Sequence, residues 1–317
     1  MKPIVYIDGR EGTTGLQIVQ RLQSRADVEL LLIDEDKRKD NVERKRLMNQ
    51  ADIVFLCLPD AAAREAVDLI DNPRTRVIDA STAHRVAPGW VYGFPELSAQ
   101  RRKEIRDAAR VANPGCYATG FISVIYPLVR AGILPPDYPL AVHAVSGYTG
   151  AGKKAIAQYT DPNRDRELDT PRQYALTLSH KHIPEMMAVT GLMRKPVFDP
   201  IICDFPQGMV VSVPLHLDLL RGKPDLEALR AVYCGAYAGQ KFIEVMPLQG
   251  EGVLNGGFLD AGALAGTNRL QIFVCGNEEQ AMIAARLDNL GKGASGAAVQ
   301  NMNLMLGLEE TAGLLAE

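Results

Sequence analysis

No apolar run in this sequence is long enough to form a membrane-spanning helix. A bilayer span needs roughly 20 such residues, whereas the first apolar run, residues 4–7, is short and ends at Asp8. A secretory signal peptide also needs a longer apolar stretch. We therefore expect a cytoplasmic protein without a membrane partner.

Long blocks of like charge are also missing. The chain has 35 Lys and Arg residues and 38 Asp and Glu residues, which give a formal net charge of -3. Nucleic acids and anionic membranes attract clustered positive charge, so this balance argues against both as main partners. A content of 47% hydrophobic and 23% charged residues is typical of a soluble globular protein, and 317 residues suffice for two domains.

The cysteines form no recognisable pair. They are odd in number, widely scattered and without a C-x-x-C spacing: Cys57, Cys116, Cys203, Cys234 and Cys275. A structural zinc site or a disulfide framework is therefore not expected, and we predict no metal. The remaining question is whether one of these thiols is reactive.

Short apolar runs alternate with helical patterns in the first third of the chain. The expected strands are residues 3–7, 28–33, 53–58 and 76–79, and the expected helices are residues 14–25, 61–70 and 98–109. The run at 53–58 is apolar throughout, as a strand buried on both faces should be. This alternation predicts an α/β fold with a Rossmann-like, doubly wound parallel sheet.

The pattern changes after Cys116, where the connections become longer. A helix is expected at residues 120–129, and strands are expected at 140–146, 209–213, 242–246 and 270–275. Such spacing suits a mixed or antiparallel sheet. Residues 282–306 return to a helical pattern.

These patterns divide the chain into two expected domains. A dinucleotide-binding domain covers residues 1–115 and is rejoined by a C-terminal helix at 285–317. Residues 116–284 form an α+β catalytic and oligomerisation domain with a mixed sheet. The dinucleotide-binding domain would therefore contain both ends of the chain.

The first expected strand leads into a glycine-rich loop and then a helix. Its glycines, Gly9, Gly12 and Gly15, form a variant of the dinucleotide fingerprint. Glycines let the backbone approach a pyrophosphate, and a helix N-terminus offers N–H groups and a positive dipole. Thr13 and Thr14 add hydroxyl donors. A turn without a ligand is the plain alternative, but the strand–loop–helix context favours a cofactor.

The ribose end of this cofactor site is ambiguous. Acidic residues at 34–36 follow the second expected strand, and basic residues at 37–39, including Arg38, come next. An acidic residue there usually binds the free 2′-hydroxyl of NAD, whereas a nearby Arg or Lys accommodates the phosphate of NADP. These residues leave both cofactors open, and the basic trio can also be a solvated turn.

Cys116 has the features of a nucleophile. It stands in Asn113-Pro114-Gly115-Cys116-Tyr117, between the end of an expected strand and the start of a helix. A helix N-terminus lowers the pKa of a thiol, and its N–H groups can stabilise an oxyanion. Most free cysteines are instead buried as small hydrophobic residues, and we assign that role to the other four.

A thiolate beside a dinucleotide indicates a particular chemistry. The thiolate attacks an activated acyl group of a small molecule, the leaving group departs, and a hydride reduces the thioester to an aldehyde. An acid–base group must also exchange the proton of the hemithioacetal.

Two neighbouring histidines are candidates for this acid–base role. His180 and His182 share a face of an extended segment, and Glu185 can orient one of them. No third ligand accompanies the pair, which argues against a metal site; a plain polar loop is the other alternative. Of the remaining histidines we keep one as a competing candidate, His216, and expect structural roles for His84 and His143.

Two further glycine-rich segments are suited to anions. Residues 146–154 begin with Ser146 and Gly147 and end in two lysines, the first of which is Lys153. Backbone donors, hydroxyls and ammonium groups together fit a phosphate or an acyl phosphate. Residues 288–296 also open a helix and could meet the cofactor from the far side. Either segment can instead be a flexible surface loop.

Four segments together resemble the N-acetyl-gamma-glutamyl-phosphate reductase family in its shorter form. They are Asp8-Gly9-x-x-Gly12-Thr13-Thr14-Gly15-Leu16, Asn113-Pro114-Gly115-Cys116-Tyr117, His180-x-His182-x-Pro184-Glu185 and Asp288-Asn289-Leu290-x-Lys292-Gly293. They follow in order along nearly the whole chain. The resemblance implies an NADPH-linked reduction of N-acetylglutamyl phosphate to the semialdehyde, with release of phosphate, in arginine synthesis. It also implies a fold shared with aspartate-semialdehyde dehydrogenase and a homodimer or homotetramer.

The resemblance also implies roles for individual residues. Cys116 is the nucleophile, and the His-x-His pair supplies the acid–base group, with His182 preferred over His180. The longer form of the family usually has Arg between these histidines, where this chain has Lys181. The residues expected to bind NADPH are Gly9, Gly12, Thr13, Thr14, Gly15, Arg38, Ser81 and Asn289. Those expected to contact the acyl phosphate are Asn113, Ser146, Gly147, Lys153 and Glu185.

Rival functions differ in substrate or in class. Reductases of aspartyl phosphate or of carrier-linked aminoadipyl phosphate keep the chemistry and change the substrate. The His-x-His-x-Pro-Glu segment argues against the aspartyl version, and a net charge of -3 gives no sign of a basic entrance for a carrier protein. A non-catalytic dinucleotide sensor would bind NADPH, and its function would not change if Cys116 were replaced.

Overall fold

The computed structural model describes residues 2–314, which form two compact units. Unit 1 comprises residues 2–95, 99–115 and 294–314, and unit 2 comprises residues 96–98 and 116–293. Residues 285–293, which we expected in the dinucleotide-binding domain, lie in unit 2 because they complete and follow a strand of its sheet. Within residues 2–314, no helix is both long and apolar enough to cross a membrane.

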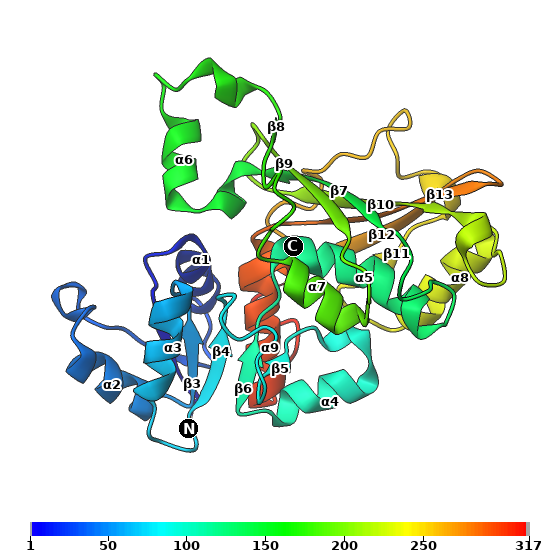
Figure 1. The fold of residues 1–317 in the computed structure, drawn as a ribbon. Helices are drawn as coiled ribbons and strands as arrows, with labels where there is room; N and C mark the ends of the chain where they lie inside the picture. The colour runs from blue at the N-terminus through cyan, green and yellow to red at the C-terminus, as the bar shows by residue number, and fades with distance from the viewer. Residues whose placement is uncertain (1, 315–317) are drawn as a thin grey trace. The chain divides into compact units, whose positions relative to one another are not determined.

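Unit 1 is built on a parallel sheet, as the alternating pattern predicts (Figure 1). Its strands lie in the order β2-β1-β3-β4-β6-β5. They are β1 (Ile4–Asp8), β2 (Glu29–Leu31), β3 (Ile53–Leu56), β4 (Arg76–Asp79), β5 (Val91–Tyr92) and β6 (Arg110–Ala112). The helices that flank them are α1 (Thr13–Leu22), α2 (Asn41–Gln50), α3 (Asp60–Asp68), α4 (Ala99–Asp107) and α9 (Gly296–Leu306).

The order of the strands locates a binding edge in unit 1. From β1 the chain goes to β2 on one side, and then to β3 and β4 on the other side. Ligands of open parallel sheets bind at the carboxyl ends of the strands, where this reversal occurs. The glycine-rich loop follows β1 at this point, so the fold puts it where a dinucleotide would bind.

Helix α2 is one element that the sequence pattern did not reveal. Only Leu47 and Met48 are buried in it, so no apolar stripe marks it as amphipathic. Its start is fixed instead by Asp40, whose side chain accepts a hydrogen bond from the N–H of Val42.

Unit 2 contains a mixed sheet, as expected from its long connections. The strand order is β11-β12-β13-β10-β7-β9-β8. The strands are β7 (Ala141–Gly147), β8 (Arg172–Gln173), β9 (Val197–Cys203), β10 (Met209–His216), β11 (Ile243–Val245), β12 (Leu270–Gly276) and β13 (Gln280–Leu287). The helices are α5 (Cys116–Arg130), α6 (Lys153–Thr160), α7 (Ile183–Thr190) and α8 (Leu226–Ala236).

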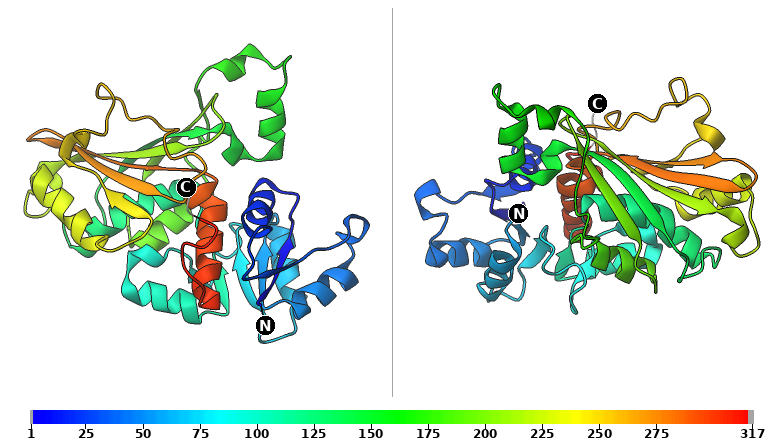
Figure 2. Two further views of the ribbon diagram at one scale, coloured as in Figure 1. Left: turned by 180° about the vertical axis from the view of Figure 1, so that it is seen from behind. Right: turned by 45° about the horizontal axis from the view of Figure 1, so that its top comes forward.

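The two faces of this sheet are covered differently. Helices α5, α7 and α8 lie on one face, and the right-hand view of Figure 2 shows the strands of the other face in the open. Part of that open face is covered by the loop after β11, where Leu254 and Leu259 pack against Val210 and Phe273.

The strand β13 corrects the helical pattern that we expected over residues 282–306. It pairs with β10 on one side and β12 on the other, and only residues 296–306 form the helix α9. Most of β13 is buried, and its residues 281–285 form a continuous apolar run. Such a run cannot be distinguished from a buried helix by periodicity alone.

Helix α5 contains a proline. Two tyrosines, one in α8 and one directly after it, donate hydrogen bonds to carbonyls near this proline. Pro127 has no N–H, so the carbonyl of Ser123 lacks its regular helical donor. The hydroxyl of Tyr237 donates to that carbonyl at 2.7 Å, and the hydroxyl of Tyr233 donates to the carbonyl of Val124 at 2.7 Å. Both tyrosines are buried. The proline is therefore tolerated in the helix that begins with Cys116.

We expect Tyr237→Phe to destabilise the protein by about 2 kcal/mol, because it leaves the buried carbonyl of Ser123 without a donor. Tyr233→Phe is the matched control and should cost about 1 kcal/mol, since a regular helix still supplies Val124 with the N–H of residue 128. Urea unfolding of the two variants measures the difference. Equal losses would show that Pro127 creates no special need for Tyr237.

Candidate active site

The glycine-rich loop of unit 1 needs its glycines for two different reasons. Gly9 has φ of +82°, and a Cβ there would lie 2.4 Å from the carbonyl oxygen of Cys57. A Cβ on Gly15 would lie 2.6 Å from the carbonyl oxygen of Gly9. A Cβ on Gly12 would meet nothing closer than 3.4 Å. The loop itself therefore requires Gly9 and Gly15 but leaves the space beside Gly12 for a ligand.

The start of α1 fits a phosphate group. Thr13 is its first residue, and the Thr13 hydroxyl is buried without a hydrogen-bond partner among residues 2–314. Thr14 follows in the same first turn, where the helix N–H groups and dipole favour an anion. A buried hydroxyl normally has a partner. An orphaned hydroxyl at this helix start thus fits the pyrophosphate of a dinucleotide.

We expect Gly12→Ala to weaken NADPH binding by roughly tenfold or more while the protein folds normally, because the added methyl group occupies space needed by the pyrophosphate. The matched control is Gly235→Ala in α8, where a Cβ would have no neighbour within 4 Å. Fluorescence titration with NADPH and thermal unfolding measure both variants. Unchanged affinity in Gly12→Ala would mean that the loop is only a turn.

The ribose end of the site is more exposed. Arg38 forms a 3.5 Å ion pair with Glu35, and Lys37 lies 3.6 Å from Asp34. Exposed pairs of this kind contribute little, so a ligand phosphate can displace the carboxylate from Arg38. Arg44, which sequence reasoning missed, instead donates two hydrogen bonds, at 3.3 and 2.7 Å, to the buried Asp8.

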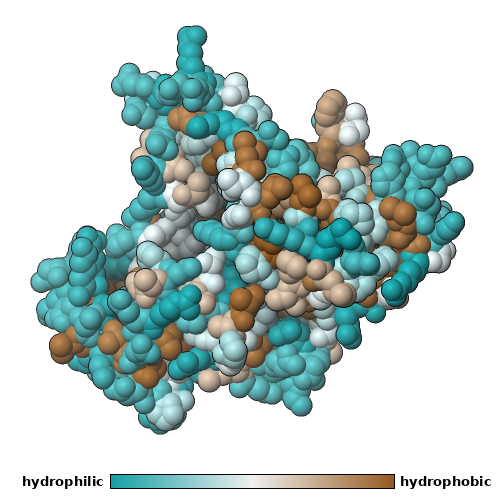
Figure 3. All heavy atoms as spheres, viewed as in Figure 1, coloured by the Kyte–Doolittle hydropathy of each residue, from teal (hydrophilic) through white to brown (hydrophobic). Residues whose placement is uncertain are grey.

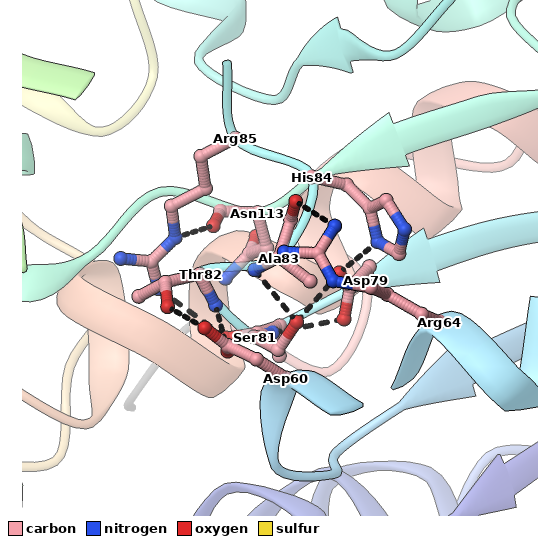
Figure 4. A network of polar contacts seen from close by, with 10 residues as sticks. Asp60, Arg64, Asp79, Ser81, Thr82, Ala83, His84, Arg85 and Asn113 are labelled. Carbon is pink, nitrogen blue, oxygen red and sulfur yellow. Dashed lines mark hydrogen bonds and ion pairs between the residues drawn. The ribbon is translucent and has the colours of Figure 1, made fainter. Parts of the chain in front are cut away.

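Ser81 belongs to a polar network at the carboxyl end of β4 (Figure 4). Its hydroxyl donates to Asp79 at 2.7 Å and accepts the N–H of Ala83 at 3.1 Å. His84 Nδ1 lies 2.6 Å from the same carboxylate, and its ring stacks on Trp90. Because the hydroxyl proton is committed to Asp79, Ser81 can offer a ligand only an acceptor. These contacts hold His84 in place, and its structural role stays a prediction.

Asn113, a predicted substrate contact, is buried in unit 1 with its amide engaged. Its Nδ2 donates to the carbonyl of Ala294 at 2.9 Å, and its Oδ1 accepts from Asn301 at 3.2 Å. The carbonyl of Asn113 accepts from Arg85 Nε at 3.0 Å. Arg85 was not among the predicted site residues, yet this bond fixes its guanidinium close to the turn that leads to Cys116.

Cys116 is the first residue of α5, so the helix begins four residues before the expected start at residue 120. It packs against Gly293, where a Cβ would lie 2.7 Å from the Cβ of Cys116. The following helix is buried along most of its length, so the thiol stands at the N-terminus of a fixed dipole. This is the arrangement that favours a thiolate.

An aromatic and imidazole cluster surrounds the residue after Cys116. The ring of Tyr117 lies 5.6 Å from that of His180 and 5.9 Å from that of His182. The rings of the two histidines are 4.8 Å apart and almost perpendicular. Phe198 closes the cluster from β9. The structure thus brings His180 and His182 together around the start of α5.

Tyr174 is a member of this cluster that sequence reasoning missed. Its hydroxyl donates to the hydroxyl of Tyr117 at 3.0 Å across 57 residues of sequence. Burial raises the pKa of both tyrosines, and the nearby charge of Cys116 raises it further. Both phenols therefore stay protonated. No local spacing in the sequence links Tyr174 to Tyr117, so only the fold reveals the pair.

The two histidines differ in how they are held. The Nδ1 of His180 accepts the backbone N–H of His182 at 3.1 Å. His182 is buried and stands directly before α7, whose first turn contains Pro184 and the buried Glu185. A proline at the start of a helix has a fixed φ, and the N–H that it lacks would have no partner within the helix. The proline therefore fixes where α7 begins, with His182 just ahead of it.

The segment from Asp288 to Gly293 is tied down at several points. Asp288 accepts the N–H of Gly266 at 2.7 Å. Asn289, a predicted cofactor contact, accepts the N–H of Gly208 at 2.9 Å and donates to the carbonyl of Gly147 at 3.3 Å. Its amide therefore joins loops within unit 2. Whether it also touches the cofactor stays a prediction.

The other predicted anion-binding segment continues β7. Ser146 is buried, and its hydroxyl donates to the carbonyl of Gly147 at 3.2 Å. A Cβ on Gly147 would lie 2.6 Å from the carbonyl oxygen of Pro206, so this position requires glycine. Lys153 is exposed at the start of α6.

His216 lies far along β10 from this cluster. Met209, at the start of β10, pairs with Ser146, whereas His216 pairs with Gln280 at the other end of the strand. A strand rises about 3.3 Å per residue, which separates the two ends by roughly 23 Å. His216 is therefore poorly placed to exchange protons at Cys116. His143 lies beside Asp199 at 3.2 Å on the sheet surface.

The chain matches known proteins over both units. Residues 4–107 match the NAD-binding domain of semialdehyde dehydrogenases, and residues 116–289 match their dimerisation domain. Among solved structures, aspartate semialdehyde dehydrogenase II of Vibrio cholerae has a TM-score of 0.73 at 17% identity, over 97% of this chain and 99% of that one. At this identity the likeness shows a shared fold.

Three curated relatives are much closer in sequence. N-acetyl-gamma-glutamyl-phosphate reductase 2 of Nostoc sp. is 49% identical over 99% of both chains. The reductase of Sinorhizobium fredii is 52% identical over 96% of this chain and 99% of its own. Reductase 2 of Pseudomonas putida is 50% identical over 96% of this chain and 97% of its own. By sequence, fold and motif order together, the chain belongs to the N-acetyl-gamma-glutamyl-phosphate reductases of the semialdehyde dehydrogenase family.

Proposed function

We propose that this chain reduces N-acetyl-gamma-glutamyl phosphate to N-acetylglutamate 5-semialdehyde with NADPH and releases phosphate, as a cytoplasmic enzyme of arginine biosynthesis. The observation that carries the proposal is Cys116 at the first position of the buried helix α5, where the next residue, Tyr117, packs against the His180–His182 pair. The names of relatives at about half identity support the choice of substrate.

Cys116 carries the covalent step. Its thiolate attacks the acyl carbon, the C–O bond to phosphate breaks, and a thioester forms as phosphate leaves. The glycine-rich loop would hold NADPH, which would supply the hydride for reduction of this thioester. The N–H groups at the start of α5 stabilise the negative oxygen that forms in each step.

His182 acts as the general acid and base. It gives a proton to the oxygen as the hemithioacetal forms, and it takes one back as the aldehyde is released and the thiolate of Cys116 returns. His180 has a positioning role, since its Nδ1 is engaged by the backbone N–H of His182. Tyr117 and Tyr174 enclose the pair and remain neutral donors.

A homodimer or homotetramer is part of the proposal. The open face of the unit 2 sheet carries exposed apolar side chains, including Val197 at 53% and Met282 at 42% exposure. Figure 3 shows separate apolar patches on the surface of this unit among more hydrophilic areas. A second copy would cover such a face, and residues 116–289 match a dimerisation domain.

One assay tests the proposed function. Phosphate-dependent oxidation of N-acetylglutamate semialdehyde is measured with NADP and NAD in parallel, and aspartate semialdehyde is the competing substrate. We expect activity that requires phosphate, prefers NADP and selects the N-acetylglutamyl compound. Preference for aspartate semialdehyde would transfer the chain to the aspartyl branch, and absence of any turnover with intact NADPH binding would favour a sensor.

Arg38→Ala should weaken NADPH binding by roughly tenfold and leave NADH binding unchanged, because a charge-assisted bond to the 2′-phosphate is lost. The matched control is Arg46→Ala on α2, which removes an exposed arginine that is also paired with a glutamate three residues away. Titration with both cofactors measures the effect. Equal behaviour of the two variants would place the 2′-phosphate on another base.

A further inference from the structure

Lys292 lies inside unit 2 in a buried ion pair. Its Nζ is 2.6 Å from Oε1 of Glu96, and both residues are only 1% exposed. The Nζ also lies 5.7 Å from the centre of the ring of Phe242. The Gly-Lys-Gly pattern in the sequence suggests an exposed anion-binding loop, but the structure turns this lysine inward, onto a carboxylate 196 residues away.

The turn that carries Lys292 packs directly against Cys116, the proposed nucleophile. Residues 291–295 form a single turn of π-helix. Gly293, next to Lys292, packs on Cys116 so closely that a Cβ would lie 2.7 Å from the Cβ of Cys116. A Cβ on Gly291 would lie 1.9 Å from the carbonyl oxygen of Thr267. Any movement of this turn therefore acts directly on the position of the thiol.

Stability alone is a weak reason for such a pair. Removing two charges from water costs about as much as their attraction returns, and well-packed apolar residues often stabilise a core as well or better. Single-turn π-helices are uncommon and are found at functional sites. An ion pair that anchors one of them against a nucleophile has a direct use: it fixes the turn in one place.

We propose that Lys292 and Glu96 are a positioning pair that sets the orientation of Cys116 for attack. The pair touches neither substrate nor cofactor in this role; it acts through Gly293. A displacement of about 1 Å in a reacting group can cost roughly 10²-fold in rate, so anchoring of this kind has a measurable effect. The inference rests on the proposed function only in treating Cys116 as the nucleophile.

The test uses three variants of the full chain: Lys292→Met, Glu96→Leu and the double variant. Each single variant leaves a buried charge without its partner and should lower the melting temperature. The double variant replaces both charges with apolar side chains of similar size, which should restore the melting temperature. Each protein is assayed for kcat and KM, and the rate of iodoacetamide labelling of Cys116 is followed across pH by peptide mass spectrometry.

We expect the double variant to be stable and still defective. Its kcat should fall roughly 10²-fold with KM unchanged, and the labelling of Cys116 should slow at neutral pH, with its midpoint moved to higher pH. Arg286→Met is the matched control, because this buried arginine donates to Gln271 on the sheet face opposite α5. It should lower the melting temperature and leave Cys116 labelling unchanged.

Two results would overturn the inference. Wild-type kcat and wild-type labelling in a stable double variant would show that the pair only fills the core. Slow labelling in Arg286→Met as well would show that Cys116 reports general loosening. Because labelling requires no acyl substrate, a failure of the proposed function would leave this readout unchanged and would be seen in the substrate assay alone.

Discussion

Replacing Cys116 with serine should leave no measurable reductase activity, while NADPH binds with near-normal affinity. A serine hydroxyl is a far weaker nucleophile at neutral pH than a thiolate at a helix N-terminus. Cys116 belongs to unit 2 and the cofactor loop belongs to unit 1, so we expect the substitution to leave the loop unchanged. Initial rates in both directions and fluorescence titration with NADPH measure the two effects. Near-normal turnover would exclude the thioester.

The other cysteines provide the controls for this experiment. None of the five, all within residues 2–314, forms a disulfide. Burial raises the pKa of Cys57, Cys203 and Cys275, so these thiols should react slowly at neutral pH. Iodoacetamide should therefore modify Cys116 first and inactivate the enzyme, and Cys234→Ser should be active. Inactivation that tracks another cysteine would assign the nucleophile elsewhere.

His182→Asn should reduce the rate by roughly 10²–10⁴, the usual effect of general acid–base catalysis. Histidine titrates near neutral pH with little tuning, so the pH–rate profile of the variant should lose an ionisation in that region. Cofactor affinity should barely change. The measurement is kcat across pH in the aldehyde-oxidising direction.

His180→Asn is the matched control for His182, since both histidines belong to the same ring cluster. It should cost less than His182→Asn, because His180 is expected only to orient its neighbour. If the two variants exchanged their effects, the roles would be reversed within the pair. If only His216→Asn were damaging, the acid–base assignment would be wrong, despite the distant place of His216 on β10.

The sequence was most informative where one local pattern has one structural solution. The apolar runs of β1, β3 and β4 predicted the parallel sheet of unit 1, and the glycine-rich segment after β1 was expected as a loop between a strand and a helix, where the structure has it. The turn before Cys116 likewise predicted a helix start close to that residue, although α5 begins at Cys116 and not at the expected residue 120. In each case the relevant interactions are local or are imposed by a buried strand.

The sequence was least informative where an element has no distinctive pattern. β13 has the apolar content of either a central strand or a buried helix, and α2 lacks an apolar stripe. β9 contains Pro200, which argues against a strand inside a sheet, yet it pairs with β7 along its whole length. Tertiary packing decided all three.

The candidate site was also hard to predict where its contacts join residues that are distant in the sequence. The pairs Tyr174–Tyr117 and Lys292–Glu96 join residues 57 and 196 positions apart, and nothing in one sequence connects them. The inward position of Lys292 also opposes the general expectation that lysines are exposed. The roles of Cys116, His182 and the other named site residues stay predictions until the variants are measured.

Neither unit can complete its fold until the C-terminal part of the chain has been synthesised. β13 lies between β12 and β10, so until residues 280–287 leave the ribosome the sheet of unit 2 exists only as separate pieces. Helix α9, which packs on β4 and α4 of unit 1, comes later still. Nascent domains generally fold from the N-terminus onward, one at a time. This chain instead carries open strand edges and uncovered apolar surface until residue 306 has been added, and throughout that interval aggregation and chaperone binding compete with folding.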